Sequence, residues 1–224
     1  MLICYYQSVM SGDMVTCMKG TTDMAIAPGR VPMVTTADDM PGPGQGRWTY
    51  KDYAAIPDDG RRYEIVDGVL YMTPAPNEAH QTTVGRLFRY LAVQVEDSGH
   101  GRVYIAPFDV ELALNVVVQP DVVIVLNENL EKITDSRIIG APDLVVEVAS
   151  PGTMGYDRTR KLQAYARAGV PEYWIADPWS RTVEVFTLEI NSYRSLGVFE
   201  GKATLPSKVI AGFPVHVEQF FVRS

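Results

Sequence analysis

The stretch "APDLVVEVASPGTMGYDRTRK", residues 141–161, contains an apolar segment that carries one carboxylate near its end. Residues 143–149 are short and rich in valine, which is typical of a buried strand. Glu147 lies inside this segment, and a carboxylate in apolar surroundings is costly unless another group pairs with it. Two interpretations are open: Glu147 is an edge residue paired with an arginine, or it belongs to a site that uses its charge.

A second carboxylate begins another apolar strand, expected at residues 119–126 within "VVVQPDVVIVL". Pro120 suits the first residue of a strand because it cannot donate a ladder hydrogen bond. If this strand pairs antiparallel with 143–149, its start lies opposite the end of its partner. The two-residue period of a strand then allows Asp121 and Glu147 to converge. The alternative is that Asp121 only caps a turn after Pro120.

Two ionised carboxylates about 4 Å apart repel each other by roughly 4 kcal/mol at an effective dielectric constant of about 20. Such a pair either shares a proton or holds a divalent cation. Oxygen ligands from few side chains suit Mg²⁺ or Mn²⁺, which keep several bound waters. The ion lowers the pKa of a bound water and neutralises charge on a phosphodiester. The pair therefore favours a metal-dependent hydrolytic site with Asp121 and Glu147 as ligands.

A lysine follows on a helix expected at residues 156–168, which Gly169 ends. Asp157 and Lys161 are four residues apart and share one face of that helix. Lys161 could orient the attacking water or stabilise the charge that develops on the phosphate. The alternative is a surface ion pair between Asp157 and Lys161, which contributes only a few tenths of a kcal/mol.

Strands dominate the remainder of the sequence, with two main helices between them. Asp67 and Gly68 predict a tight hairpin turn within "RRYEIVDGVLYM", residues 61–72. Apolar residues at helical spacing predict a first helix at about 80–97. Further strands are expected at 102–106, at 109–114, on both sides of 177–180 and, as a strand or short helix, near the end of the chain. This pattern predicts an α/β or α+β fold with a mixed sheet flanked by two main helices.

The composition is that of an ordinary globular protein of 224 residues with a formal net charge of −7. The acidic balance argues against a protein that coats nucleic acid by bulk electrostatics. Its two cysteines, Cys4 and Cys17, provide neither a disulfide framework nor zinc-ligand spacing. We see no signal peptide and no apolar run of the roughly 20 residues that a membrane span needs, so we expect a cytoplasmic protein without a membrane partner.

Residues 1–46 differ in composition from the rest of the chain. They hold most of the nine methionines, show no lasting helical or strand period, and end in the Pro/Gly run "MPGPGQG". We expect a poorly ordered N-terminal extension over residues 1–46 and one folded domain over residues 47–224.

Four segments, in order, resemble the Uma-two family of endonucleases in the PD-(D/E)XK, or restriction-endonuclease-like, superfamily. They are "RRYEIVDGVLYM", "QPDVVIV", "APDLVVEVASP" and "GYDRTRKLQAYARAGVPEYWIADP". The resemblance covers about residues 47–222. It implies a restriction-endonuclease-like fold and a nuclease that hydrolyses DNA with Mg²⁺ or Mn²⁺.

The resemblance also implies roles for individual residues. Asp121 matches the Pro-Asp carboxylate, Glu147 matches the second carboxylate, and the Val148 carbonyl would be a backbone metal ligand. The superfamily's Glu-x-Lys form would place a lysine at position 149, where this chain has Ala149, and Lys161 matches the displaced basic residue. Two further residues match family positions near the site, and these are Glu64 and His80. Either could instead be ordinary, Glu64 as an exposed strand residue and His80 as a helix-start residue.

Arginines on the two expected helices are candidates for contacts with phosphates, or are simply solvated: Arg86, Arg89, Arg158, Arg160 and Arg167. Three aromatic residues are expected in the core rather than stacked on bases: Tyr165, Tyr173 and Trp174.

Two alternatives remain open for the protein as a whole. It could form a homodimer, and it could be a nuclease-like module that binds or regulates without cutting. A hydrolase that uses Ser150 with His80 is disfavoured because no G-x-S-x-G elbow surrounds the serine.

Overall fold

The structure of the chain is a computed structural model that describes residues 33–221. Residues 1–32, and with them Cys4, Cys17 and most of the expected N-terminal extension, lie outside the described residues. Residues 33–46 lie on the folded domain, where Thr35 pairs with Met72 in a short antiparallel ladder. Gln45 Oε1 accepts a hydrogen bond from the Leu70 N–H at 2.8 Å.

The described residues form a mixed α+β fold with two six-stranded sheets. The first sheet has the order β1-β3-β2-β6-β5-β8 and the second the order β12-β11-β10-β9-β7-β4. Strands of the first sheet are β1 Thr35–Thr36, β2 Arg62–Val66, β3 Val69–Thr73, β5 Asp109–Ala113, β6 Val116–Val118 and β8 Arg137–Ile139. Strands of the second are β4 Gly101–Ile105, β7 Val122–Leu126, β9 Leu144–Val148, β10 Glu172–Asp177, β11 Thr182–Glu189 and β12 Ser192–Glu200.

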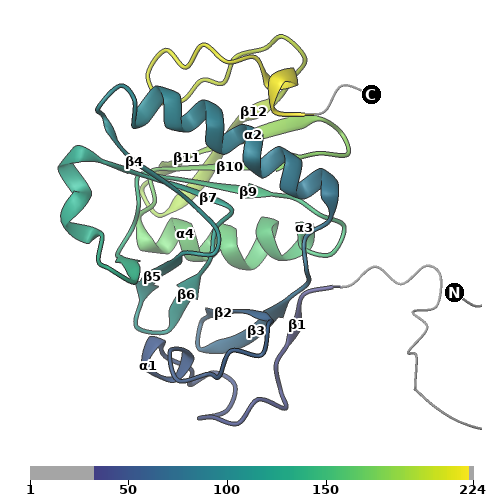
Figure 1. The fold of residues 1–224 in the computed structure, drawn as a ribbon, viewed down its shortest axis with the longest axis vertical. Coiled ribbons are helices and arrows are strands. Elements are labelled where there is room, and N and C mark those ends of the chain that lie inside the picture. Colours follow the sequence, from purple (N-terminus) through teal and green to yellow (C-terminus); the bar gives the residue numbers. More distant parts are fainter. Residues whose placement is uncertain (1–32, 222–224) are drawn as a thin grey trace, which may run out of the picture. The chain divides into compact units, whose positions relative to one another are not determined.

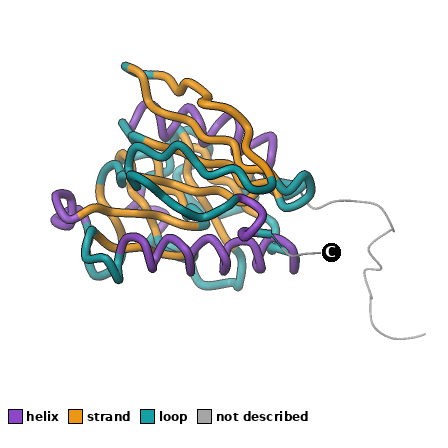
Figure 2. The backbone as a smooth tube through the Cα atoms, turned by 90° about the horizontal axis from the view of Figure 1, so that it is seen from above, coloured by secondary structure: helices purple, strands orange, loops and turns teal. Residues whose placement is uncertain are grey.

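Two helical segments cover the opposite faces of the second sheet (Figure 1). The long helix α2, Glu78–Val95, packs its apolar stripe on one face. The shorter α4, Leu162–Ala168, packs on the other face together with strands of the first sheet. Figure 2 shows the strands running side by side, with the helical segments set against them. The prediction of an α+β fold with two main helices is confirmed, although the strands divide into two sheets.

The hairpin and the first helix follow the sequence closely. Asp67 and Gly68 both have positive φ, at 55° and 73°, as the predicted tight turn requires. Gly68 is also needed for space, because a Cβ there would lie 2.5 Å from the Gly46 carbonyl oxygen. In the part of the chain that the structure describes, no helix combines the length and the apolar character that crossing a membrane requires.

The single strand expected at residues 119–126 is wrong at its start. Strand β6 ends at Val118 in the first sheet, and β7 begins at Val122 in the second. Pro120 has no N–H, and the Gln119 N–H donates to Glu64 Oε1 at 2.9 Å instead of joining a ladder. The chain therefore passes from one sheet to the other at Pro120, which leaves Asp121 at the crossing point.

The predicted antiparallel pairing of the two apolar strands is confirmed. Strand β7 pairs with β9, with Val122 opposite Val146 and Val123 opposite Val145. One further step along this register brings Asp121 opposite Glu147. Asp121 lies two residues before Val123, and Glu147 lies two residues after Val145, so each carboxylate faces the same side of the sheet as its valine. The two valines belong to the same buried cluster.

The second main helix is less regular than expected. A short α3, Met154–Tyr156, continues into a π-helical turn, Asp157–Lys161, before α4 begins. The Leu162 N–H donates to the Asp157 carbonyl, five residues earlier, as in a π-helix. Asp157 and Lys161 still share a buried face, whereas the three residues between them are exposed.

Candidate active site

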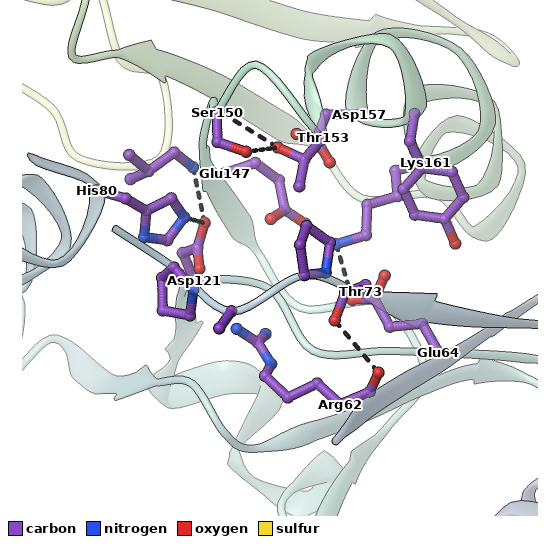
Figure 3. Close-up of a pocket in the computed structure, with 15 residues that line it drawn as sticks. Arg62, Glu64, Thr73, His80, Asp121, Glu147, Ser150, Thr153, Asp157 and Lys161 are labelled. Carbon is purple, nitrogen blue, oxygen red and sulfur yellow. Dashed lines mark hydrogen bonds and ion pairs between the residues drawn. The ribbon is translucent and has the colours of Figure 1, made fainter. Parts of the chain in front are cut away.

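A small pocket is lined by residues from both sheets, from the start of α2, and from α3 and the π-helical turn that precede α4 (Figure 3). Its cavity volume is about 40 Å³. A buried water needs roughly 10–15 Å³ on the same measure, so the pocket has room for a few waters or an ion but none for a nucleotide. His80 and Asp121 lie on one side of the pocket, Glu64 and Lys161 on the other, and Glu147 between them.

Asp121 is held in place at the crossing point between the sheets. Its Oδ2 accepts a hydrogen bond from the Val148 N–H at 2.8 Å and lies 3.2 Å from His80 Nε2. Burial alone would raise the pKa of Asp121, but the hydrogen bond and charge of His80, with the Val148 N–H, lower it below its usual value. Asp121 is therefore an ionised carboxylate at neutral pH.

His80 owes its position to the first turn of α2. The side chain of the N-cap residue, Asn77, accepts a hydrogen bond from the His80 backbone N–H at 2.9 Å. This contact fixes the helix start, and the imidazole then reaches Asp121 through Nε2. The buried Nδ1 atom has no hydrogen-bond partner among the described residues. His80 is thus more than a helix-start residue, because it orients one carboxylate of the pocket.

Lys161 joins two carboxylates that come from different sheets. Its Nζ lies 2.8 Å from Glu147 Oε1 and 2.8 Å from Glu64 Oε1. Glu147 Oε1 also accepts a hydrogen bond from the Tyr165 hydroxyl at 2.6 Å. The exposed fractions of Glu64, Glu147 and Lys161 are 1%, 3% and 4%. Water therefore hardly screens these charges, and each must be balanced within the protein.

The protonation states in the pocket follow from the burial of several carboxylates around a single lysine. Burial raises the pKa of Glu147 to about 7, with Asp121 and Glu64 adding to the effect against the attraction of Lys161. Burial also raises the pKa of Asp157 well above its usual value. Burial lowers the pKa of Lys161, but Glu147, Glu64 and Asp157 outweigh it and raise the pKa above its usual value. Lys161 therefore stays a cation that donates hydrogen bonds and cannot act as a base.

The donor set of the pocket fits a hard divalent cation. Asp121 and Glu147 offer carboxylate oxygens, and Val148 lines the same pocket. Glu64 Oε2 is buried without a hydrogen-bond partner in the described part of the chain, so an acceptor is left unused. Within residues 33–221, no three His, Cys, Asp or Glu side chains converge as metal ligands. A cation here would rely on two carboxylates, backbone oxygen and water, which suits Mg²⁺.

The structure brings together all five side chains that the sequence singled out for this site. Three ordinary interpretations are wrong: Glu147 pairs with a lysine rather than an arginine, Glu64 is buried, and Asp157 and Lys161 form no surface ion pair. Ser150 Oγ lies 3.1 Å from Thr153 Oγ1, so its hydroxyl has a partner other than His80. The expected core residues Tyr165, Tyr173 and Trp174 are fully buried.

The arginines proposed to contact nucleic acid do not line the pocket. Arg86 donates to the Gln219 carbonyl at 3.2 Å, and Arg158 and Arg167 form ion pairs with Glu184 and Asp67. Arg89 is exposed, with its guanidinium carbon 5.9 Å from the centre of the Tyr90 ring, and Arg160 is also exposed. None of these five lines the pocket. Their contact with nucleic acid stays a prediction.

Three contributors to the pocket were missed from the sequence. Arg62 lines it, Gln119 hydrogen-bonds both Arg62 and Glu64, and the Tyr165 hydroxyl holds Glu147. Strand periodicity could have found Arg62, because it lies two residues before Glu64 and so faces the same side of β2. The roles of Gln119 and Tyr165 depend on contacts between distant segments, which no local pattern shows.

Comparison with known proteins gives one family match from the sequence and one similar fold among solved structures. The family model Uma2, described as "Putative restriction endonuclease", matches residues 50–218. A solved structure, described as a putative nuclease belonging to DUF820 from Anabaena variabilis ATCC 29413, is similar with a TM-score of 0.65 and 17% sequence identity. The similarity covers 77% of this chain and 97% of that chain. No curated protein sequence matches.

Proposed function

The chain belongs to the Uma2 family, and from this premise we propose that it is a metal-dependent endonuclease that hydrolyses phosphodiester bonds in DNA. The observation that carries the proposal is the Lys161 ammonium, which lies 2.8 Å from both Glu147 and Glu64 in the pocket that also contains Asp121. Two carboxylates and a buried ammonium can serve metal-assisted phosphodiester hydrolysis, the carboxylates as metal ligands and the ammonium as a stabiliser of developing negative charge.

Asp121, Glu147 and the Val148 carbonyl would hold Mg²⁺ or Mn²⁺. The ion, when bound, supplies a water of lowered pKa and neutralises charge on the phosphate. Asp121 is ionised and oriented by His80 and the Val148 N–H, so it is ready to act as a ligand without rearranging. Lys161, which remains protonated, donates hydrogen bonds toward a water or a phosphate oxygen and stabilises developing negative charge.

In the direct test, supercoiled plasmid and linear DNA are incubated with the full chain in Mg²⁺ or Mn²⁺, with and without a chelator. We expect cleavage that needs the metal and that is lost in Asp121→Asn. Cleavage that persists in chelator, or in the Asp121→Asn variant, would refute the metal assignment. Absence of cleavage of any DNA by the wild-type chain with either metal would refute the nuclease itself.

One observation favours a second candidate, a nuclease-like module that binds nucleic acid without cutting it. Lys161 already supplies the positive charge that a cation would bring to Glu147. Titration calorimetry with Mn²⁺ separates the two candidates. Stoichiometric binding that is lost in Glu147→Gln supports the nuclease, whereas tight nucleic-acid binding without any metal binding supports the module.

A further inference from the structure

Arg62 is a cation of the pocket that the metal chemistry leaves without a role. It lies at the start of β2, is partly exposed, and lines the pocket together with Lys161. Figure 3 shows its guanidinium directed toward the Asp121 side of the pocket. Arg62 also lines two larger hollows, of about 440 and 550 Å³, one next to Gln119 and the other next to Thr73.

Arg62 makes no direct ion pair with an acidic side chain of the described residues. In the described range of the chain, no carboxylate oxygen lies within 4.0 Å of its guanidinium, whereas Arg137, Arg158, Arg167 and Arg194 each have such a partner. Its hydrogen bonds go to neutral groups instead. Nε donates to Gln119 Oε1 at 3.2 Å, and Nη2 donates to the Gln119 carbonyl at 3.1 Å. Within residues 33–221, the Nη1 group of Arg62 has no hydrogen-bond partner.

Gln119 fixes this arginine in one position. Its amide nitrogen donates to Asp109 Oδ1 at 2.8 Å and to the Tyr53 hydroxyl at 3.0 Å. The amide oxygen must therefore face Arg62. The backbone N–H of Gln119 meanwhile donates to Glu64, the partner of Lys161. A guanidinium held in this way loses little side-chain entropy when it binds a ligand.

The ligand that fits a fixed guanidinium without a direct ion-pair partner is a phosphate group, which arginine binds through paired hydrogen bonds. The pocket is too small to take in a nucleotide, so the phosphates of a nucleic-acid strand must lie over its mouth. There they face the carboxylates of Glu64, Asp121 and Glu147, and a cation at the rim adds to the bound metal ion in offsetting the repulsion.

We propose that Arg62, held by Gln119, binds a backbone phosphate of the nucleic-acid strand at the mouth of this pocket. The proposal rests on the proposed function for its substrate class. It assigns the phosphate contact to the hairpin strand β2 rather than to the helix arginines.

The test measures binding of labelled short duplex and single-stranded DNA by fluorescence anisotropy, over a range of salt concentrations. Ca²⁺ replaces the other metals, and gels confirm that the DNA stays intact. We expect Arg62→Gln to weaken binding about tenfold and to reduce the slope of log K against log salt by about 0.9 for duplex DNA, since one phosphate contact is lost. Arg62→Lys keeps the charge and should retain most of the slope but not all of the affinity.

Arg61→Gln is the matched control, because Arg61 carries the same charge on the neighbouring position and also lines both larger hollows, but it pairs with Asp59 and does not line the pocket. Circular dichroism and thermal melts establish that all variants fold. An equal loss in Arg61→Gln and Arg62→Gln, or no change in either, would overturn the assignment of Arg62. If the wild-type chain cleaves DNA and Arg62→Gln binds normally, only this proposal fails. If the wild-type chain neither cleaves nor binds DNA, the proposed function fails as well.

Discussion

Lys161 lies 2.8 Å from Glu147 although 14 positions separate the two residues in the sequence. In the Glu-x-Lys form that the sequence resemblance led us to consider, the lysine would come from the same strand as the glutamate, where this chain has Ala149. Here the π-helical turn after the strand carries the ammonium back to the carboxylate. The same Nζ also contacts Glu64 on β2, so one cation in the π-helical turn forms ion pairs with a carboxylate of each sheet.

Removing this cation should destabilise the fold. We expect Lys161→Met to lower the free energy of unfolding by about 3–5 kcal/mol, because buried carboxylates lose their counter-charge. Urea denaturation measures the change. The control is Arg158→Met in the same helical turn, whose ion pair with Glu184 is partly exposed and should cost less than about 1 kcal/mol. Similar losses in both variants would contradict the structural role of Lys161.

Metal binding should depend on Asp121 and not on Asp143, the carboxylate at the other end of the β7–β9 strand pair. We expect Asp121→Asn to abolish Mn²⁺ binding in calorimetry while the fold is kept, since an amide oxygen can still accept from Val148. Asp143 is the matched control. It is also buried, and it accepts from the Leu126 N–H and the Asn129 amide instead of lining the pocket. Loss of Mn²⁺ binding in Asp143→Asn alone would place the metal elsewhere.

Protons should compete with the metal at Glu147. Its pKa is raised to about 7 in the metal-free protein, so the carboxylate is largely protonated below that pH and ionised above it. Because only the ionised form is a ligand, we expect Mg²⁺ affinity to rise as the pH increases through 7 and then to level off. Calorimetry between pH 5.5 and 8.5, a range that extends more than one unit below and above this pKa, measures the change in Mg²⁺ affinity. An affinity that is constant over the range would contradict Glu147 as a ligand.

His80 should tune the metal site through Asp121 rather than act on substrate. We expect His80→Ala to weaken Mn²⁺ binding about 10- to 100-fold, as is usual when a group that orients a metal ligand is lost.

Ser150→Ala should leave metal binding and DNA cleavage near the wild-type level, since Ser150 pairs with Thr153. A strong loss of cleavage in Ser150→Ala with intact metal binding would instead support a serine-based mechanism.

Much of the local structure could be predicted from sequence because its causes are local. Asp67 and Gly68 specify the hairpin turn, and the apolar stripe specifies α2. The edge strand β12 was missed, since it is exposed along much of its length and its polarity does not alternate cleanly. The break between β6 and β7 was also missed, because Pro120 is equally compatible with the first residue of a strand and with a crossing between sheets.

The convergence of Asp121 and Glu147 could be predicted from the residues, because an antiparallel pair of apolar strands with one carboxylate at a start and the other at an end allows it. The cations that reach these carboxylates depend on how distant segments pack together. The position of Lys161 depends on a π-helical turn, and that of Arg62 depends on how the first sheet lies against the second sheet. These contacts join distant segments through packing and charge balance, and neither leaves a periodic pattern in the chain.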